Sequence, residues 1–360
     1  MIKKKIKRKK LNEINWCFLL LIIFFNFYIF SIYLWEEYKI IKLISIVILF
    51  LFSSLAFFID EKIKKKDLKI IIFLIIFALI LPKFYISFYA IIISKFIKNN
   101  KKLEFLLFLS IFFYLLTLIL SKFGYLEVNN LKSTIRYFEG FKVFRHTLGF
   151  NHPNTAMSLL LPIFFLLYYL YYDKAKILIP ISIFIIGKIV FNYTYSRTTF
   201  LLILLFIVLI LANDKYIKKL KTIFCLESGI IIFFTFFLPY YFKNTFLNKL
   251  FSGRLVLFYN YLTKFQITFL GNKEIIEYYK LYPLDNVYLR TLFENGIIGF
   301  ILLIILISYT MKILFKNKDY RAIRIFSIVL IFGFMESTAL FYYFNIIYFI
   351  IPDYIFTEKE

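Results

Sequence analysis

Residues suited to phosphate and proton chemistry gather in three short polar segments of a chain that is otherwise largely apolar. The segment LGFNHPNTAM carries His152 and Asn154, TYSRTTF carries Arg197, and a third region runs from SGRL, with Arg254, to LDNVYLRTLFENGIIGF, with Asp285. Guanidinium groups present fixed N–H donors that match phosphate oxygens, and a carboxylate or an imidazole can take a proton from a hydroxyl group. Together these residues predict an enzyme that handles a lipid-linked substrate bearing phosphate.

The chain that positions these residues has the composition of a membrane protein. Hydrophobic residues make up 62% of its 360 residues, and its mean hydropathy is +0.80. A soluble domain of this length could not bury so much apolar surface, and most of it falls in blocks long enough to cross a bilayer. We therefore predict an all-α, polytopic membrane protein in which residues 1–360 form a single integral membrane domain.

About twelve apolar runs qualify as transmembrane helices. They lie at about 16–34, 40–59, 68–81, 84–97, 103–121, 155–172, 177–192, 198–212, 222–241, 288–311, 323–335 and 338–351. Several are shorter than the roughly 20 residues that span a bilayer, so ten or eleven helices is the alternative. In particular, Pro82 could kink one long helix instead of separating two.

Basic residues are concentrated in alternate connecting loops, as expected where short cytoplasmic loops are enriched in lysine and arginine. This alternation places both termini in the cytoplasm. It also places two long loops, about 122–154 and 242–287, on the outer face of the membrane. Those two loops are themselves net basic, which favours an anionic partner.

The formal charge of +24 does not indicate nucleic-acid binding, because the basic residues punctuate apolar runs and no RNA- or DNA-binding signature accompanies them. The first ten residues, MIKKKIKRKK, are predicted to lie against the anionic headgroups of membrane lipids. No Gly-rich phosphate loop, HExxH or nucleophile elbow is present, which argues against an ATPase, a zinc protease and a serine hydrolase. Cys17 and Cys225 lack metal-ligand spacing, so we expect neither a metal site nor a cofactor.

In the first long loop, Pro153 and the polar residues after it predict the start of a helix. The unpaired N–H groups and the positive dipole end of that helix would suit an anion. The simpler interpretation is that His152 and Asn154 only cap the helix. The same loop also carries Arg136 and Arg145.

The remaining candidates each have two interpretations as well. Arg197 is expected at the outer end of a helix, where it either clamps a substrate diphosphate or extends to lipid headgroup phosphates. Asp285 could accept a proton from a sugar hydroxyl, with Asn286 bonding neighbouring hydroxyls. Asp285 alone is more typical of a helix N-cap, and the two roles are compatible if the active site lies at the helix mouth.

In this order, the segments resemble those of the Wzy-type O-antigen and capsular polysaccharide polymerases, within the wider family that includes O-antigen ligases. The resemblance covers about residues 145–300 by motif and the rest by hydropathy. It implies a metal-independent glycosyltransferase of the GT-C type at the outer face of the bacterial cytoplasmic membrane. The substrate implied is an oligosaccharide repeat unit on undecaprenyl diphosphate, and a chain-length regulator protein is an expected partner.

The resemblance also implies roles for individual residues. Arg197 and Arg254 stand at the motif positions and would stabilise the departing lipid diphosphate, with Arg145 a weaker third. Asp285 becomes the candidate base, although His152 could titrate in its place. The substrate-binding candidates are Arg136, Arg145, His152, Asn154, Asn286 and Tyr288.

Two other functions remain open. The ligase branch typically has a histidine where this chain has Asp285, so the polymerase is favoured over a ligase that transfers lipid-linked glycan to another acceptor. A transporter of polyprenyl-linked saccharides should carry polar groups deep within its helices. The predicted helices of this chain are almost purely apolar inside, which favours an enzyme working at the membrane surface.

Overall fold

The computed structural model describes residues 100–126, 135–138, 141–272, 274–341 and 343–356, together with isolated residues from 69 to 94. The helices predicted at 16–34 and 40–59, most of those at 68–81 and 84–97, Cys17 and Pro82 lie outside the described residues. The chain divides into two compact units, which are described separately below. The first comprises residues up to 74, 86–203 and 348–360, and the second comprises 75–85 and 204–347. The single membrane domain stays a prediction.

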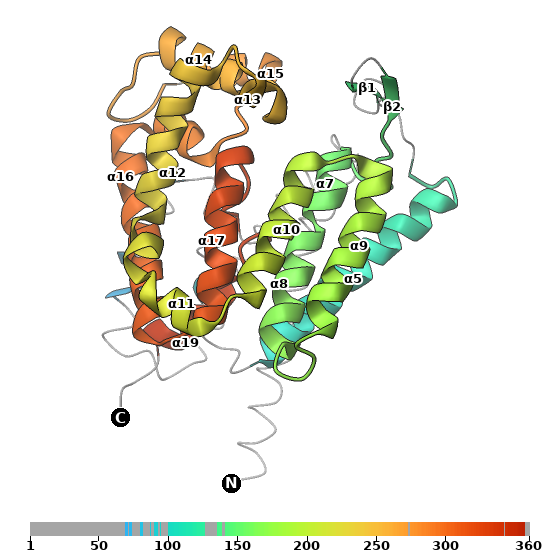
Figure 1. Ribbon diagram of the computed structural model, residues 1–360. Helices are drawn as coiled ribbons and strands as arrows, with labels where there is room; N and C mark the ends of the chain where they lie inside the picture. The colour runs from blue at the N-terminus through green and yellow to red at the C-terminus, as the bar shows by residue number, and fades with distance from the viewer. Residues whose placement is uncertain are drawn as a thin grey trace. The chain divides into compact units, whose positions relative to one another are not determined.

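The first unit is a set of packed helices with a short hairpin. Its elements are α5 (Lys101–Lys122), β1 (Ile135–Phe138), β2 (Phe141–Phe144), α7 (Pro153–Ser158), α8 (Leu160–Tyr171), α9 (Leu178–Thr194), the first part of α10 (Arg197–Leu211) and α19 (Pro352–Ile355). Helix α8 packs against α5 and α9, and α7 packs against α9 (Figure 1). The core of this unit is formed largely by consecutive apolar side chains of α8, including Phe164, Phe165 and Leu166, which are buried. The antiparallel β1–β2 pair is the one departure from the predicted all-α fold in the described chain.

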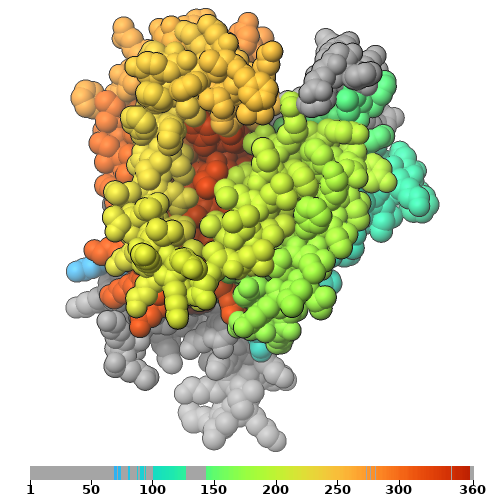
Figure 2. Space-filling view, in the orientation of Figure 1, coloured from blue at the N-terminus to red at the C-terminus, as the bar shows by residue number. Residues whose placement is uncertain are grey.

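The second unit is built on three mutually packed helices. Its elements are the rest of α10, α11 (Asp214–Lys219), α12 (Lys221–Phe242), α13 (Phe246–Leu250), α14 (Arg254–Lys264), α15 (Glu274–Leu281), α16 (Val287–Lys316) and α17 (Tyr320–Met335). Helices α12, α16 and α17 contact one another, while α14 packs on α12 and α15 on α16. The short helices α13, α14 and α15 gather at the end where α12 ends and α16 begins (Figure 1), and Figure 2 shows this segment in yellow and orange at that end of the unit.

Four helical segments of the described chain are long and apolar enough to cross a membrane: α5, α7 with α8, α12 and α16. Helices α9 and α10 are shorter apolar helices. The structure therefore supports an all-helical scaffold and a multi-pass membrane protein. The count of about twelve spans stays a prediction.

The helix predicted over 338–351 is wrong. That stretch consists largely of turns, and its one regular element is α18 (Ile347–Ile350). The side chain of Asn345 accepts a hydrogen bond from the backbone N–H of Ile347, two residues on. Such local bonds compete with helix formation, although the segment is buried and apolar enough to have suggested a span.

Helix α16 is broken at Gly296, whose backbone angles of φ 70° and ψ −171° are not helical. The break leaves helical N–H and C=O groups without their usual partners, and the loop at 268–272 supplies new ones. Asn272 N donates to Phe293 O at 2.9 Å, and Ile297 N donates to Thr268 O at 3.0 Å. Because an unpaired buried backbone group is costly, this loop and the break depend on each other.

Two glycines permit this close approach. A Cβ on Gly296 would lie 2.3 Å from the carbonyl oxygen of Phe269, and a Cβ on Gly271 would lie 2.1 Å from that of Glu294. Both residues also have positive φ, the region that side chains other than glycine rarely adopt. The NG pair within LFENGIIGF therefore marks a required crossing of loop and helix.

Gly296→Ala is expected to lower the thermal stability of the protein and its level in the membrane. A backbone with positive φ and ψ near 180° alone costs an alanine about 1–3 kcal/mol, and the clash with Phe269 adds to it. Gly229→Ala in α12 is the matched control, because a Cβ there would meet nothing within 4 Å. Thermal melting of the two purified variants checks this, and equal melting temperatures would contradict the account of the break.

Candidate functional site

Arg145 is a buried structural tie in the first unit. Its Nε donates to the carbonyl oxygen of Thr194 at 2.8 Å, and its Nη2 donates to Oδ1 of Asn154 at 2.5 Å. A cation at the last residue of α9 also suits the negative end of the helix dipole. Arg145 therefore joins the segment after β2 to the end of α9 and the start of α7. The side chain of Arg136, on β1 and paired in register with Val143, is not described.

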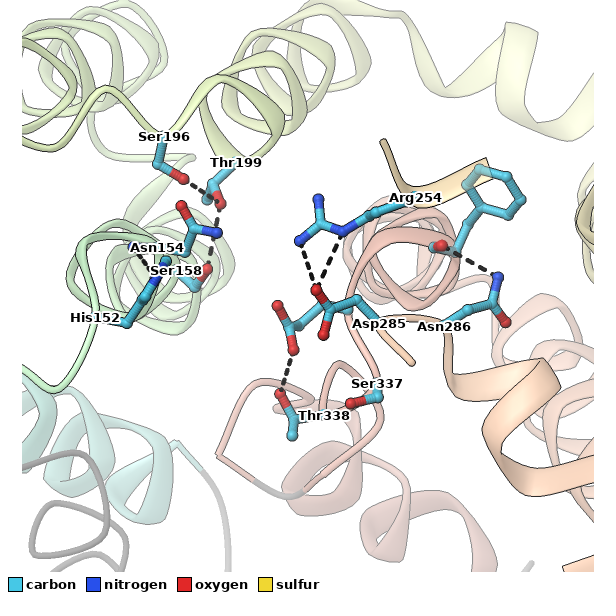
Figure 3. A network of polar contacts seen from close by, with 12 residues as sticks. His152, Asn154, Ser158, Ser196, Thr199, Arg254, Asp285, Asn286, Ser337 and Thr338 are labelled. Carbon is cyan, nitrogen blue, oxygen red and sulfur yellow. Dashed lines mark hydrogen bonds and ion pairs between the residues drawn. The ribbon is translucent and has the colours of Figure 1, made fainter. Parts of the chain in front are cut away.

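His152 caps helix α7. Its Nδ1 accepts a hydrogen bond from the backbone N–H of Asn154 at 3.0 Å, and the helix begins at Pro153 as predicted. The capping interpretation is confirmed for His152, with the imidazole in the place more often taken by serine or aspartate. The Oδ1 of Asn154 accepts a hydrogen bond from Arg145, so both polar side chains serve the local fold. Figure 3 shows the bond between His152 and Asn154. Their contact with a substrate stays a prediction.

Arg197 is the first residue of α10, at the end of the helix where it was expected. Tyr195, two residues before it, adopts a left-handed conformation with φ 47°. The neighbouring hydroxyls hold this end of α10 in place: Thr199 Oγ1 lies 3.2 Å from Ser158 Oγ and 3.3 Å from Ser196 Oγ (Figure 3). Arg197 is half-buried there, beside a rigid hydroxyl cluster.

In the second unit, the structure brings together two of the predicted catalytic residues. Arg254 opens α14, and its Nε and Nη2 both donate to Oδ2 of Asp285, at 3.2 and 3.1 Å (Figure 3). The side chain of Arg254 is 10% exposed and that of Asp285 is 30% exposed. The pair is therefore partly sheltered from water but open on the aspartate side. Asp285 is not the helix N-cap, because that position belongs to Asn286.

Asn286 and Tyr288 are held inside the helix packing. Asn286 Oδ1 accepts from the N–H of Leu289 at 2.9 Å, and its Nδ2 donates to the carbonyl oxygen of Phe334 at 3.1 Å. The hydroxyl of Tyr288 donates to the carbonyl oxygen of Leu330 at 2.8 Å. Both residues are completely buried. Both side chains thus join α16 to α17, and their predicted contact with a substrate stays a prediction.

Glu336 is a further acidic residue beside this ion pair, and the sequence analysis assigned it no role. It directly follows α17, and its Oε1 accepts a hydrogen bond from the hydroxyl of Thr338 at 3.4 Å. The residue is half-buried. Burial of the carboxyl, and next the negative charge of Asp285, raise the pKa of Glu336 to about 8, against the opposing effect of Arg254. At neutral pH, most molecules therefore carry a proton on Glu336.

A second arginine borders Glu336. Arg290 donates from Nε to Oε1 of Glu294 at 3.0 Å and from Nη1 to the hydroxyl of Ser337 at 2.8 Å. Its guanidinium also lies 4.4 Å from the centre of the Tyr279 ring, a cation–π contact. We refer to Arg254, Asp285, Arg290 and Glu336 as the Arg254 cluster. A charged residue between two apolar runs was the sequence signal that could have pointed to Glu336.

Within the described residues, no three histidine, cysteine, aspartate or glutamate side chains are arranged to hold a metal ion. The charged groups of the Arg254 cluster are guanidinium and carboxyl groups. Guanidinium groups can hold an anion by directed N–H bonds. A carboxyl whose pKa is near neutrality can give or take a proton.

Arg145→Ala is expected to lower the thermal stability of the first unit. Removal of the guanidinium leaves the Thr194 carbonyl and the Asn154 amide without that buried donor, at a cost of about 1–3 kcal/mol. Lys176→Ala is the control, because Lys176 is exposed in the same unit. Thermal melting measures the difference. A melting temperature for Arg145→Ala that equals that of the control would refute the role of Arg145 as a tie.

Glu336→Gln is expected to raise the melting temperature at pH 9 and to change it little at pH 5. Because the pKa of Glu336 is about 8 in the folded protein and 4.5 in an ordinary glutamate, the folded state binds this proton more tightly. The resulting stability is complete below pH 4.5 and is lost as the pH rises through about 8. Glutamine stays neutral throughout. Glu277→Gln, an exposed carboxyl of α15, controls for loss of charge, and a pH-independent effect of Glu336→Gln would contradict the raised pKa.

Comparisons with known proteins add no information on function, so the candidate site is argued from its geometry. Neither the protein-family models, nor the curated proteins, nor the solved structures contain a match to this chain. Two of the three predicted catalytic residues, Arg254 and Asp285, are in direct contact, and Glu336 completes a carboxyl pair beside them. The Arg254 cluster is therefore the strongest candidate for an active site in the described chain.

Proposed function

We propose that this protein is a metal-independent glycosyltransferase that joins undecaprenyl-diphosphate-linked oligosaccharide units into a surface polysaccharide. The observation that carries the proposal is the Arg254–Asp285 pair at the mouth of α16, with Arg290 and Glu336 around it. The proposal places the reaction at the outer face of the bacterial cytoplasmic membrane, with both termini in the cytoplasm. A chain-length regulator remains an expected partner.

The position of the Arg254 cluster suits a lipid diphosphate. Helices α12 and α16 have the length and composition of membrane spans, and the cluster lies where α16 begins. The diphosphate of a membrane lipid lies at such a boundary, between the acyl region and water. Asp285 holds the guanidinium of Arg254 in a defined orientation before any substrate arrives. Donors fixed in advance stabilise developing negative charge most effectively.

The reaction would proceed as a single exchange of bonds. The acceptor hydroxyl gives its proton to a carboxylate, and its oxygen bonds to the anomeric carbon of the donor sugar. The bond from that carbon to the diphosphate oxygen breaks, and the electron pair leaves with the lipid diphosphate. Arg254 and Arg290 would offset the negative charge that develops on the leaving group.

A transporter of lipid-linked saccharide is the second candidate, and one observation favours it. Glu227 lies within α12, and its Oε2 is buried beside Ser327. Ionisable groups at membrane depth are typical of transport pathways. Against this, the Arg254 cluster lies at the mouth of α16, where a surface enzyme needs charged groups.

The test measures the size of lipid-linked and surface glycan in cells from which the protein has been removed. These cells are compared with the same cells complemented with wild type, Arg254→Ala or Lys249→Ala. Cells with no protein, and cells with Arg254→Ala, should accumulate single repeat units on the outer face, because loss of one such donor slows the reaction by about 10²–10³-fold. Lys249, exposed in α13, is the control and should restore long polymer. Membrane levels of each variant are measured in parallel.

Other outcomes would change the assignment. Accumulation of long lipid-linked polymer would identify a ligase that acts after polymerisation. Single units confined to the cytoplasmic face would identify a transporter. Unchanged lipid-linked sugars in cells without the protein would refute every function considered above.

A further inference from the structure

We infer that Glu336 is the general base that takes the proton from the acceptor hydroxyl, and that Asp285 is a positioning residue that orients Arg254. This inference rests on the proposed function and assigns the proton transfer within it. It revises the sequence-based prediction, in which Asp285 was the candidate base. The contacts around the two carboxyl groups support the exchange of roles.

Asp285 is committed to the arginine. Both of the guanidinium donors that reach it, Nε and Nη2 of Arg254, converge on its Oδ2. Removal of this carboxylate's charge by a proton would release the arginine that the leaving group needs. A residue with that task is poorly placed to shuttle protons at each turnover.

Glu336 is held more loosely. The hydrogen bond that it accepts from Thr338 is long, at 3.4 Å, and bonds of this length are weak. Its carboxyl lies close enough to Asp285 for their charges to interact, so the two groups form a like-charge pair in one partly enclosed site. Such a pair resists double ionisation, and one member tends to retain a proton.

The charged and titratable groups that face Glu336 come from four elements. Asp285 precedes α16, Arg254 opens α14, Arg290 lies in α16 and Tyr279 lies in α15. Burial and the charge of Asp285 raise the pKa of Glu336, whereas Arg254 and Arg290 lower it, and the balance is about 8. A general base works best when its pKa lies near the working pH, because it is then both available and strong. Glu336 meets that condition.

The transfer is balanced in protons and electrons. Ionised Glu336 accepts the proton of the acceptor hydroxyl as the oxygen bonds to the anomeric carbon. The bond from that carbon to the diphosphate breaks, and the electron pair leaves with the diphosphate beside Arg254. Glu336 then releases its proton to water. Because the base must be ionised, the rate should rise as the pH passes through about 8.

The test uses the full-length protein in lipid vesicles, with lipid-linked oligosaccharide extracted from cells that lack the protein. Glycan elongation is followed from pH 6 to pH 10 for wild type, Glu336→Gln, Glu336→Asp, Asp285→Asn and the control Glu277→Gln. Wild type and the control should show a rate that rises with a midpoint near 8. The elongation rate of Glu336→Gln should be about 10²–10⁴-fold lower than that of wild type and should not rise with pH. Glu336→Asp should recover part of the rate.

Asp285→Asn provides the separating result. If Glu336 titrates, removal of the neighbouring charge shifts the midpoint of the remaining activity to lower pH. Infrared spectra should also show a protonated carboxyl that ionises near pH 8 in wild type and is missing in Glu336→Gln. This second readout does not depend on turnover, and it establishes that the glutamine variant is folded in the same spectra.

Three results would overturn the inference while the proposed function stands. The first is normal elongation by Glu336→Gln, and the second is a wild-type rate that falls as the pH passes through 8. The third is a pH profile that Asp285→Asn changes and Glu336→Gln does not. If wild type elongates nothing, the proposed function itself fails and the role of Glu336 falls with it.

Discussion

The break in α16 is the constraint on which the site in the second unit depends. At Gly296 the helix gives up its own hydrogen bonds, and the loop at 268–272 supplies replacements. Buried backbone groups must be paired, so this loop is bound to α16 wherever the break exists. The short first half of α16 is thereby fixed at the end that carries Asp285, Asn286 and Arg290. Asn286 secures the same end by capping α16 and bonding to the last turn of α17.

The pairing of charged groups at the start of α16 determines which carboxyl group could exchange a proton. At one helix mouth Arg254 pairs with Asp285, Arg290 pairs with Glu294, and Glu336 lies beside both arginines. Asp285 takes the direct contacts with Arg254, and Glu336 is left with a raised pKa. The division gives one carboxylate that orients a guanidinium and one that can exchange a proton near neutral pH. These are the two requirements of glycosyl transfer from a lipid diphosphate: an anion to stabilise and a hydroxyl to deprotonate.

Sequence patterns predicted much of this fold, because apolar runs and turn residues act locally. The helix after Pro153 and the spans that became α5, α7 with α8, and α12 appear as expected, and the run at 288–311 appears as α16 with an unforeseen break at Gly296. The helix predicted at 338–351 is wrong for an equally local reason, since the Asn345 side chain accepts a hydrogen bond from the backbone N–H of Ile347. Glu336 could not be ranked from the sequence, because its pKa depends on Asp285 and Arg254, which only the folded chain brings close. Arg145 was assigned to phosphate, yet its two described contacts are with protein groups, Thr194 and Asn154.

The most direct measurement of the central claim is the yield of lipid diphosphate per sugar linkage formed by the purified protein. With lipid-linked repeat units as both donor and acceptor, we expect one undecaprenyl diphosphate for each new linkage, and we expect both products to fall together in Arg254→Lys, whose ammonium lacks the planar fork of donors. Linkages without release of lipid diphosphate, or release that is independent of Arg254, would contradict the account.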